Sequence, residues 1–130
     1  MSYKAEKFTP STSHYKILLT VSLLNEKGYY PLSEGIGKIL KGEDDEEVEQ
    51  FKDFPTYKTL ISYNSKKISR YIMMLYRYHY LDKVYDPKTD KLYIKISTLG
   101  ETSLLKYTKK YKTNFIKKKK VKTPTIVKIQ

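Results

Sequence analysis

SKKISRYIMMLYRYHYL, residues Ser65 to Leu81, carries an apolar and a basic pattern at the same helical spacing. Ile68, Ile72 and Leu75 recur at i, i+4 and i+7, the spacing of one face of an α-helix. The opposite face carries basic side chains at the same period: Lys66, Arg70 and Arg77. The stretch therefore predicts a helix with one buried apolar face and one exposed basic face, started by Asn64 or Ser65 as N-cap.

The apolar period changes to two residues immediately after this helix. Leu92, Ile94 and Ile96 alternate with polar side chains in KLYIKIS, which is typical of a half-buried strand. The segment LDKVYD, residues 81–86, can pair with this strand, because DPKTD at 86–90 has the composition of a tight turn. We therefore predict a β-hairpin with all three apolar side chains facing the core.

Further helical segments lie on both sides of these elements. We expect Ser13 to cap the first helix, Gly28 and Gly42 to end the first and second helices, and Thr98 and Glu101 to form a capping box at the last one. These predicted segments are, in chain order, His14–Lys27, Pro31–Gly42, Glu46–Phe51 and a helix from Thr98 onward.

This order of elements defines the predicted fold class. Helices that end in a hairpin indicate an α+β, mainly α fold: a winged helix-turn-helix with a C-terminal β-hairpin wing followed by a helix. The helix at 65–80 would be the recognition helix and the hairpin at 82–96 the wing. We expect a flexible N-terminal arm at 1–13, the winged-helix domain at 14–112 and a basic tail at 113–130.

Charge is unevenly distributed along the chain. The net charge is +12, and ten lysines with no acid lie between Lys106 and Gln130. The preceding 105 residues are nearly neutral, with 16 basic and 14 acidic side chains. A near-neutral fold with a basic arm favours an anionic polymer or an anionic membrane surface as partner. The acidic run Glu43–Glu49 is interpreted as a solvated turn that lies away from any bound polyanion.

Composition limits the chemistry of the chain. There is no cysteine, which excludes disulfides, thiolate chemistry and cysteine-based zinc sites. No apolar run approaches the ~20 residues of a membrane span.

Three stretches resemble the RQC domain, the winged-helix module of RecQ-type DNA helicases. They are IGKILKG at Ile36–Gly42, SKKISRYIMMLYRYHYL at Ser65–Leu81 and LYIKISTLGETSLL at Leu92–Leu105. The resemblance covers roughly His14 to Tyr111. It implies a stand-alone RQC-like protein that binds double-stranded or branched DNA, with a helicase as a candidate protein partner. Together with the composition, the DNA binding that the resemblance implies favours a cytoplasmic, nucleoid-associated protein that does not use a membrane.

The chain also departs from that family. It contains neither a GxxxxGK[ST] phosphate loop nor cysteines for the family's zinc subdomain, so the resemblance implies no ATP-driven step. The predicted wing tip, Pro87-Lys88-Thr89, lacks the aromatic residue with which some RecQ helicases separate strands, although Tyr85 and Tyr93 flank it.

The candidate DNA-binding residues come from three segments. On the helix, lysine and arginine would neutralise phosphates, and Ser65 would lie near a phosphate at the helix N-terminus. The alternative is a solvated polar face, an ordinary hairpin turn and a solubilising tail. The candidates are Ser65, Lys66, Lys67, Arg70 and Arg77 on the helix, Lys88, Thr89 and Lys91 on the wing, and Lys117, Lys118, Lys119 and Lys120 in the tail.

Catalysis finds no support in the pattern. His14 and His79 are the only histidines, and neither has the neighbours of a nucleophile or metal site. Gly35-Ile36-Gly37 follows no strand and lacks the third glycine of a dinucleotide loop. We expect no catalytic residue, metal, cofactor or small-molecule substrate.

Two further readings remain open. The tyrosines of the 65–80 helix can stack on bases, but the spacing of Tyr71 and Tyr76 beside the apolar stripe favours packing in the core. The chain can instead be a protein-protein interaction module that docks through its apolar and tyrosine-rich surfaces. It can also be a winged-helix transcriptional regulator, which generally needs a dimer.

Overall fold

The computed structural model describes residues 8–111, so the predicted basic tail at 113–130, with Lys117 to Lys120, lies outside the described residues. The fold is α+β and mainly helical, with one two-stranded antiparallel hairpin. The elements are α1 Thr12–Glu26, α2 Ser33–Lys41, the 3-10 helix η1 Glu46–Phe51, α3 Ser65–Arg77, β1 Leu81–Asp86, β2 Lys91–Ile96 and α4 Thr98–Tyr111. The predicted order of elements and the hairpin are confirmed.

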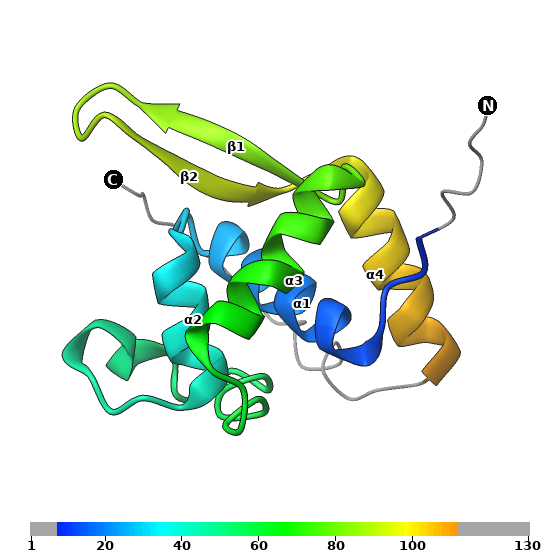
Figure 1. Cartoon of the computed structure of the whole chain (residues 1–130), viewed down its shortest axis with the longest axis horizontal. Coiled ribbons are helices and arrows are strands. Elements are labelled where there is room, and N and C mark those ends of the chain that lie inside the picture. Colours follow the sequence, from blue (N-terminus) through cyan, green and yellow to red (C-terminus); the bar gives the residue numbers. More distant parts are fainter. Residues whose placement is uncertain (1–7, 112–130) are drawn as a thin grey trace.

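Figure 1 shows how these elements are arranged. Helix α3 crosses in front of α1, with α2 on one side of the pair and α4 on the other. The hairpin projects away from the helices, so that only its base lies against them. The exposed side of α3 therefore lies next to one face of the hairpin.

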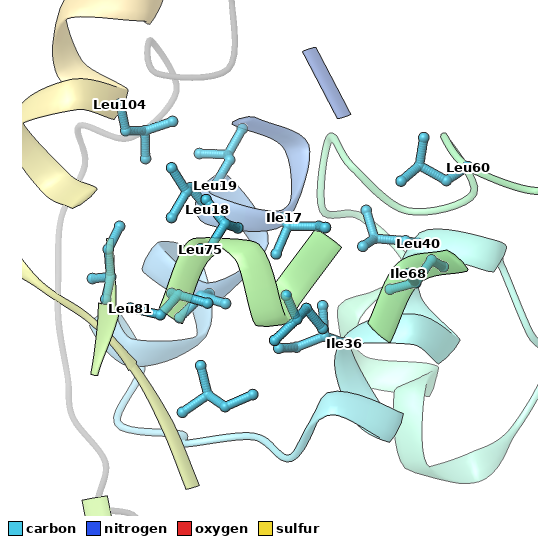
Figure 2. Packing of buried hydrophobic residues seen from close by; sticks show 14 residues of the cluster. Ile17, Leu18, Leu19, Ile36, Leu40, Leu60, Ile68, Leu75, Leu81 and Leu104 are labelled. Carbon is cyan, nitrogen blue, oxygen red and sulfur yellow. The ribbon is translucent and has the colours of Figure 1, made fainter. Parts of the chain in front are cut away.

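One apolar core joins all the main elements. The predicted apolar face of α3 is confirmed, since Ile68, Ile72 and Leu75 are at most 2% exposed. In Figure 2 side chains from α1, α2 and α3 point toward one another. They are joined by Leu81 and Leu104 from β1 and α4. A smaller cluster holds η1 in place, with Val48 and Phe51 turned inward, the face that the sequence of this short segment favours, next to Leu24, Ile39 and Phe54.

The helix ends differ from prediction in detail. Helix α1 begins at Thr12, two residues before the predicted start, and Ser11 rather than Ser13 is its N-cap. The reason is a capping box in which the Ser11 side chain accepts from His14 N–H and the His14 ring accepts from the Ser11 N–H. At α4 the cap is Ser97 rather than Thr98, because Ser97 Oγ accepts the Gly100 N–H at 3.0 Å.

Helices α2 and α3 end and begin as their sequences predict. The left-handed residue Gly42, with φ of 74°, closes α2. Asn64, one of the two predicted caps, starts α3 by accepting the Lys67 N–H at 2.8 Å. These two ends bring the C-terminus of α2 next to the N-terminus of α3.

The hairpin is tied to the loop that joins α1 to α2. Its register pairs Leu81 with Ile96 at the base and Asp86 with Lys91 at the turn. On the outer edge of β2, the Ile94 N–H donates to Pro31 O at 2.8 Å. The loop between the first two helices thus lies beside the sheet as a third backbone segment.

Three side chains are exposed that the sequence places in a short turn after Pro55 (Ile61), on the core face of the hairpin (Leu92) and beside the apolar stripe of the 65–80 helix (His79). Ile61 is 62% exposed in the turns before α3. Leu92 is 51% exposed, because the outer half of the hairpin extends past most of the helical surface, which covers this side chain only in part (Figure 1). His79 is exposed with φ of 69°, because it reverses the chain between α3 and β1.

The N-terminal segment contacts this end of α3. Residues 8–13, which belong to the predicted arm, run into the first turn of α1. The Phe8 ring stacks on Tyr78 with 4.6 Å between ring centroids and meets Tyr80 edge-on at 5.7 Å. Tyr71 and Tyr76, predicted to pack rather than stack on a ligand, are partly buried against the core.

Candidate nucleic-acid interface

The predicted basic face of α3 is exposed. Lys66, Arg70 and Arg77 are all exposed. They fall within about 40° of one another around the helix at about 100° per residue, and they span about 16 Å of its axis. Met73, 64% exposed, interrupts the stripe on the side that faces α2 and the hairpin. The three cations can therefore meet successive phosphates along one line.

The stripe is not neutralised by the chain itself. None of the ion pairs within residues 8–111 involves Lys66, Arg70 or Arg77. Helix α3 also has no acid in its first turn, where the positive end of the helix dipole favours one. Two lysines occupy that turn instead. The start of α3 therefore carries two exposed lysines and no acid of its own, although Glu43 lies close by, where it pairs with Lys41 at 3.3 Å.

The other two helix candidates have partners. Ser65 Oγ accepts from Lys41 Nζ at 3.0 Å, so Lys41 lies at the start of α3. Lys67 Nζ stands 4.3 Å from the centre of the Tyr63 ring. The sequence does not predict the contact of Lys41 with Ser65, because the two residues lie 24 positions apart and meet only when the end of α2 packs beside the start of α3.

The wing candidates surround a turn stabilised by acids. The Asp86 carboxylate accepts from the Lys88 N–H at 3.1 Å and from the Thr89 hydroxyl at 3.3 Å. Tyr85 donates to Asp90 at 2.7 Å, and this hydrogen bond raises the pKa of the Tyr85 hydroxyl. Lys88 and Lys91 are exposed but share the turn with two carboxylates, so the wing tip is far less positive than α3.

The acidic run pairs with lysines on both sides of it. Lys38 contacts Asp45 and Glu47 at 2.9 Å each, and Lys52 contacts Asp44 at 2.9 Å. These hydrogen bonds lower the pKa of Asp44 and Asp45 and raise the pKa of both lysines. The run is thus largely compensated by its neighbours and leaves the α3 stripe unpaired.

A groove of about 540 Å³ runs between α2, α3 and the hairpin. We call it the α2–α3–hairpin groove. Its floor is apolar and its ends are polar, and its lining includes Gly37, Lys41, Ser69, Met73, Leu92 and Ile94. It lies beside the basic stripe, on the side of α3 that carries Ser69 and Met73.

Residues 8–111 hold no group of three or more His, Asp or Glu side chains placed to bind a metal ion. The His14 ring is buried, and burial lowers its pKa. No helix in this same part of the chain is long and apolar enough to cross a bilayer.

No protein-family model, curated protein sequence or solved structure matches this chain. The interpretation of the surface therefore depends on its own geometry and charge.

Proposed function

We propose that the chain is a non-enzymatic winged-helix protein that binds double-stranded or branched DNA. Helix α3 would be the recognition helix, the hairpin the wing, and the basic tail a source of non-specific attraction. The observation that carries the proposal is the exposed line of Lys66, Arg70 and Arg77 on an element that contains no acid.

The layout supports a winged helix. In that architecture a short segment after the first helix lies beside the strand that follows the wing turn. Here Pro31 follows α1 and accepts a hydrogen bond from Ile94 of β2. Helices α2 and α3, joined through the turns at 52–62, then occupy the helix-turn-helix positions. The RQC-like resemblance of Ser65–Leu81 agrees with the same assignment.

Fluorescence anisotropy with duplex, forked and single-stranded DNA tests the proposal. We expect submicromolar binding at low salt that weakens steeply as salt rises, because released counterions drive the affinity. The triple variant Lys66→Glu, Lys67→Glu, Arg70→Glu should abolish binding. Its control, Lys27→Glu, Lys106→Glu, Lys109→Glu, has the same net charge but alters exposed lysines elsewhere. It should keep most of the affinity.

Two results contradict the proposal. One is the absence of binding to all three DNA forms at about 50 mM salt, where phosphate contacts are strong. The other is equal loss of binding in both triple variants, since that would mean that net charge alone attracts DNA.

A protein-protein interaction module is the second candidate. The α2–α3–hairpin groove favours it, because Met73 and Leu92 are more than half exposed there. Under this reading the α3 charge reversal leaves partner binding intact. A winged-helix transcriptional regulator is the third candidate, and sedimentation that detects a dimer would favour it.

A further inference from the structure

The α2–α3–hairpin groove leaves apolar surface uncovered. Met73 is 64% exposed and Leu92 is 51% exposed, and both line it. Ile94 and Ile68 form part of its floor. Large apolar side chains gathered around one concave surface commonly mark a docking site.

Gly37 deepens this groove. It lies in the interior of α2, where glycine is less stable than alanine. A Cβ atom at this position would meet no other atom within 4 Å, so packing in the described part of the chain does not require glycine here. The missing side chain leaves room for a group from outside residues 8–111.

The last residues of the chain have the composition to supply that group. The stretch TPTIVKIQ, Thr123 to Gln130, follows the lysine-rich tail but holds Ile126, Val127 and Ile129 within four positions. A solvated basic tail has no need of three β-branched apolar residues. Such residues favour an extended conformation with one side packed against an apolar surface.

Charge is complementary between the two. Glu34 lines the groove without an ion-pair partner among residues 8–111, whereas Lys38 at the same rim already contacts two carboxylates. The C-terminal stretch contains Lys128, follows Lys122 and has no acid. The rim thus offers a carboxylate to a segment that carries only positive charge.

The connecting chain is long enough. Fourteen residues separate Tyr111, the end of α4, from Ile126. Extended, they reach about 46 Å, whereas a domain of this size has a radius of gyration of about 13 Å. That reach is close to half the circumference of a sphere with this radius of gyration, about 52 Å, so the segment can reach most of the surface of its own molecule.

We propose that residues 125–129 dock in the α2–α3–hairpin groove of the same molecule, with their β-branched side chains against Met73 and Leu92. The proposal does not depend on DNA binding. It would keep apolar surface on both partners away from water while the lysine run remains free for other contacts.

A spin label at the C-terminus tests this inference without DNA. The chain has no cysteine, so Gln130→Cys gives one labelling position. We expect paramagnetic broadening of amide signals at Gly37, Ser69 and Leu92, and little at the α1 residue Ser22. The variant Ile126→Ser, Val127→Ser, Ile129→Ser keeps the length and charge of the tail and should lose the broadening.

A second variant fills the groove instead of changing the tail. Gly37→Leu should displace the segment and abolish the broadening, because its side chain occupies open space. Gly35→Leu is the matched control on the same helix, outside the groove lining, and should retain it. Circular dichroism checks that both variants fold.

Three outcomes would overturn the inference. One is broadening spread evenly over the surface. Another is broadening that survives the triple serine variant, which would mean that lysines alone hold the tail. The last is broadening in a mixture of labelled, isotope-free chains with unlabelled, isotope-enriched chains, which would place the segment on a second copy.

Discussion

Gly100, in the first turn of α4, lies against the backbone of the turn that joins α3 to β1. A Cβ atom there would approach Tyr80 O to 2.2 Å and the Ile96 side chain to 2.8 Å. The carbonyl belongs to the backbone and also accepts the Ser97 N–H, so it cannot move without disturbing the base of the hairpin. Position 100 therefore requires glycine because a larger side chain would clash with its neighbours, whereas position 37 has open space.

Gly100→Ala should lower the free energy of unfolding by about 1–3 kcal/mol, the usual cost of overpacking. Gly37→Ala is the control, and it should raise that free energy by up to about 1 kcal/mol through helix propensity. Urea denaturation followed by circular dichroism measures both. Equal effects of the two substitutions would mean that the contact with Tyr80 is not tight.

His14 is a buried base whose protonation opposes folding. Its Nδ1 accepts the Ser11 N–H at 2.9 Å, so the neutral ring carries its proton on Nε2. That atom is buried without a hydrogen-bond partner among the described residues. The Phe8 and Tyr71 rings lie edge-on beside it. Burial lowers the pKa of the folded-state ring below 6.5.

The unfolded chain therefore binds a proton at His14 before the folded chain does. The neutral His14 ring therefore makes its full contribution to the free energy of unfolding above pH 6.5. That contribution is lost as the pH falls from there through the folded-state pKa. Between about pH 7.5 and pH 5 the urea midpoint should fall more steeply for the natural chain than for His14→Gln. Parallel slopes in the two proteins would show that other groups cause the acid sensitivity.

At the level of helices and strands, α3 and the hairpin differ in how free their charges are. The α3 stripe lacks acids, whereas Lys88 and Lys91 lie beside Asp86 and Asp90. A bound polyanion would be attracted along the whole α3 stripe. At the hairpin, Asp86 and Asp90 would repel it. If the chain binds DNA as proposed, we expect the hairpin to contribute less to the affinity than its lysine content suggests.

Replacing Lys66 and Arg70 by alanine should lower the slope of log affinity against log salt by about 1 for each lost phosphate contact. Replacing Lys88 and Lys91 by alanine should lower it by less. Anisotropy titrations on one duplex over a range of salt concentrations compare the two. A larger effect from the hairpin pair would make the wing, not α3, the main contact.

Local patterns were sufficient to predict most of the elements. The helical period of 3.6 residues and the strand period of two residues predict α3 and the hairpin, because each depends only on neighbours in sequence. The same reasoning placed Leu92 in the core, since a period of two cannot tell where the packing surface ends. The contact of Lys41 with Ser65 was also missed, because it depends on how two helices meet.

For the whole molecule, charge is divided between a folded part and a tail. Lys66, Lys67, Arg70 and Arg77 of α3 have no ion-pair partner among the described residues, while Lys117 to Lys120 lie outside the described residues. Under the proposed function the α3 cations set the preference among duplex, fork and single strand. The lysines of the tail add electrostatic attraction that is the same for all three DNA forms. The two contributions can therefore be separated by substitution.

Replacing Lys117 to Lys120 by glutamine should weaken binding to duplex, fork and single strand by similar factors. It should also lower the salt slope, by about 1 for each lysine that contacts a phosphate. Anisotropy on all three DNA forms measures the factors. A selective loss for one form would assign recognition to the tail.

The hydrogen bonds at the outer edge of β2 also bear on how the protein behaves when it is concentrated. A two-stranded hairpin has two open edges, and each can recruit an extended chain from another molecule. Asn25 Oδ1 accepts the Ile96 N–H at 2.8 Å and Pro31 O accepts the Ile94 N–H, so one edge is already occupied. The other edge carries Lys83, whose charge opposes such pairing. We therefore expect the sheet to stay at two strands when the protein is concentrated, which would limit aggregation of a tyrosine-rich chain.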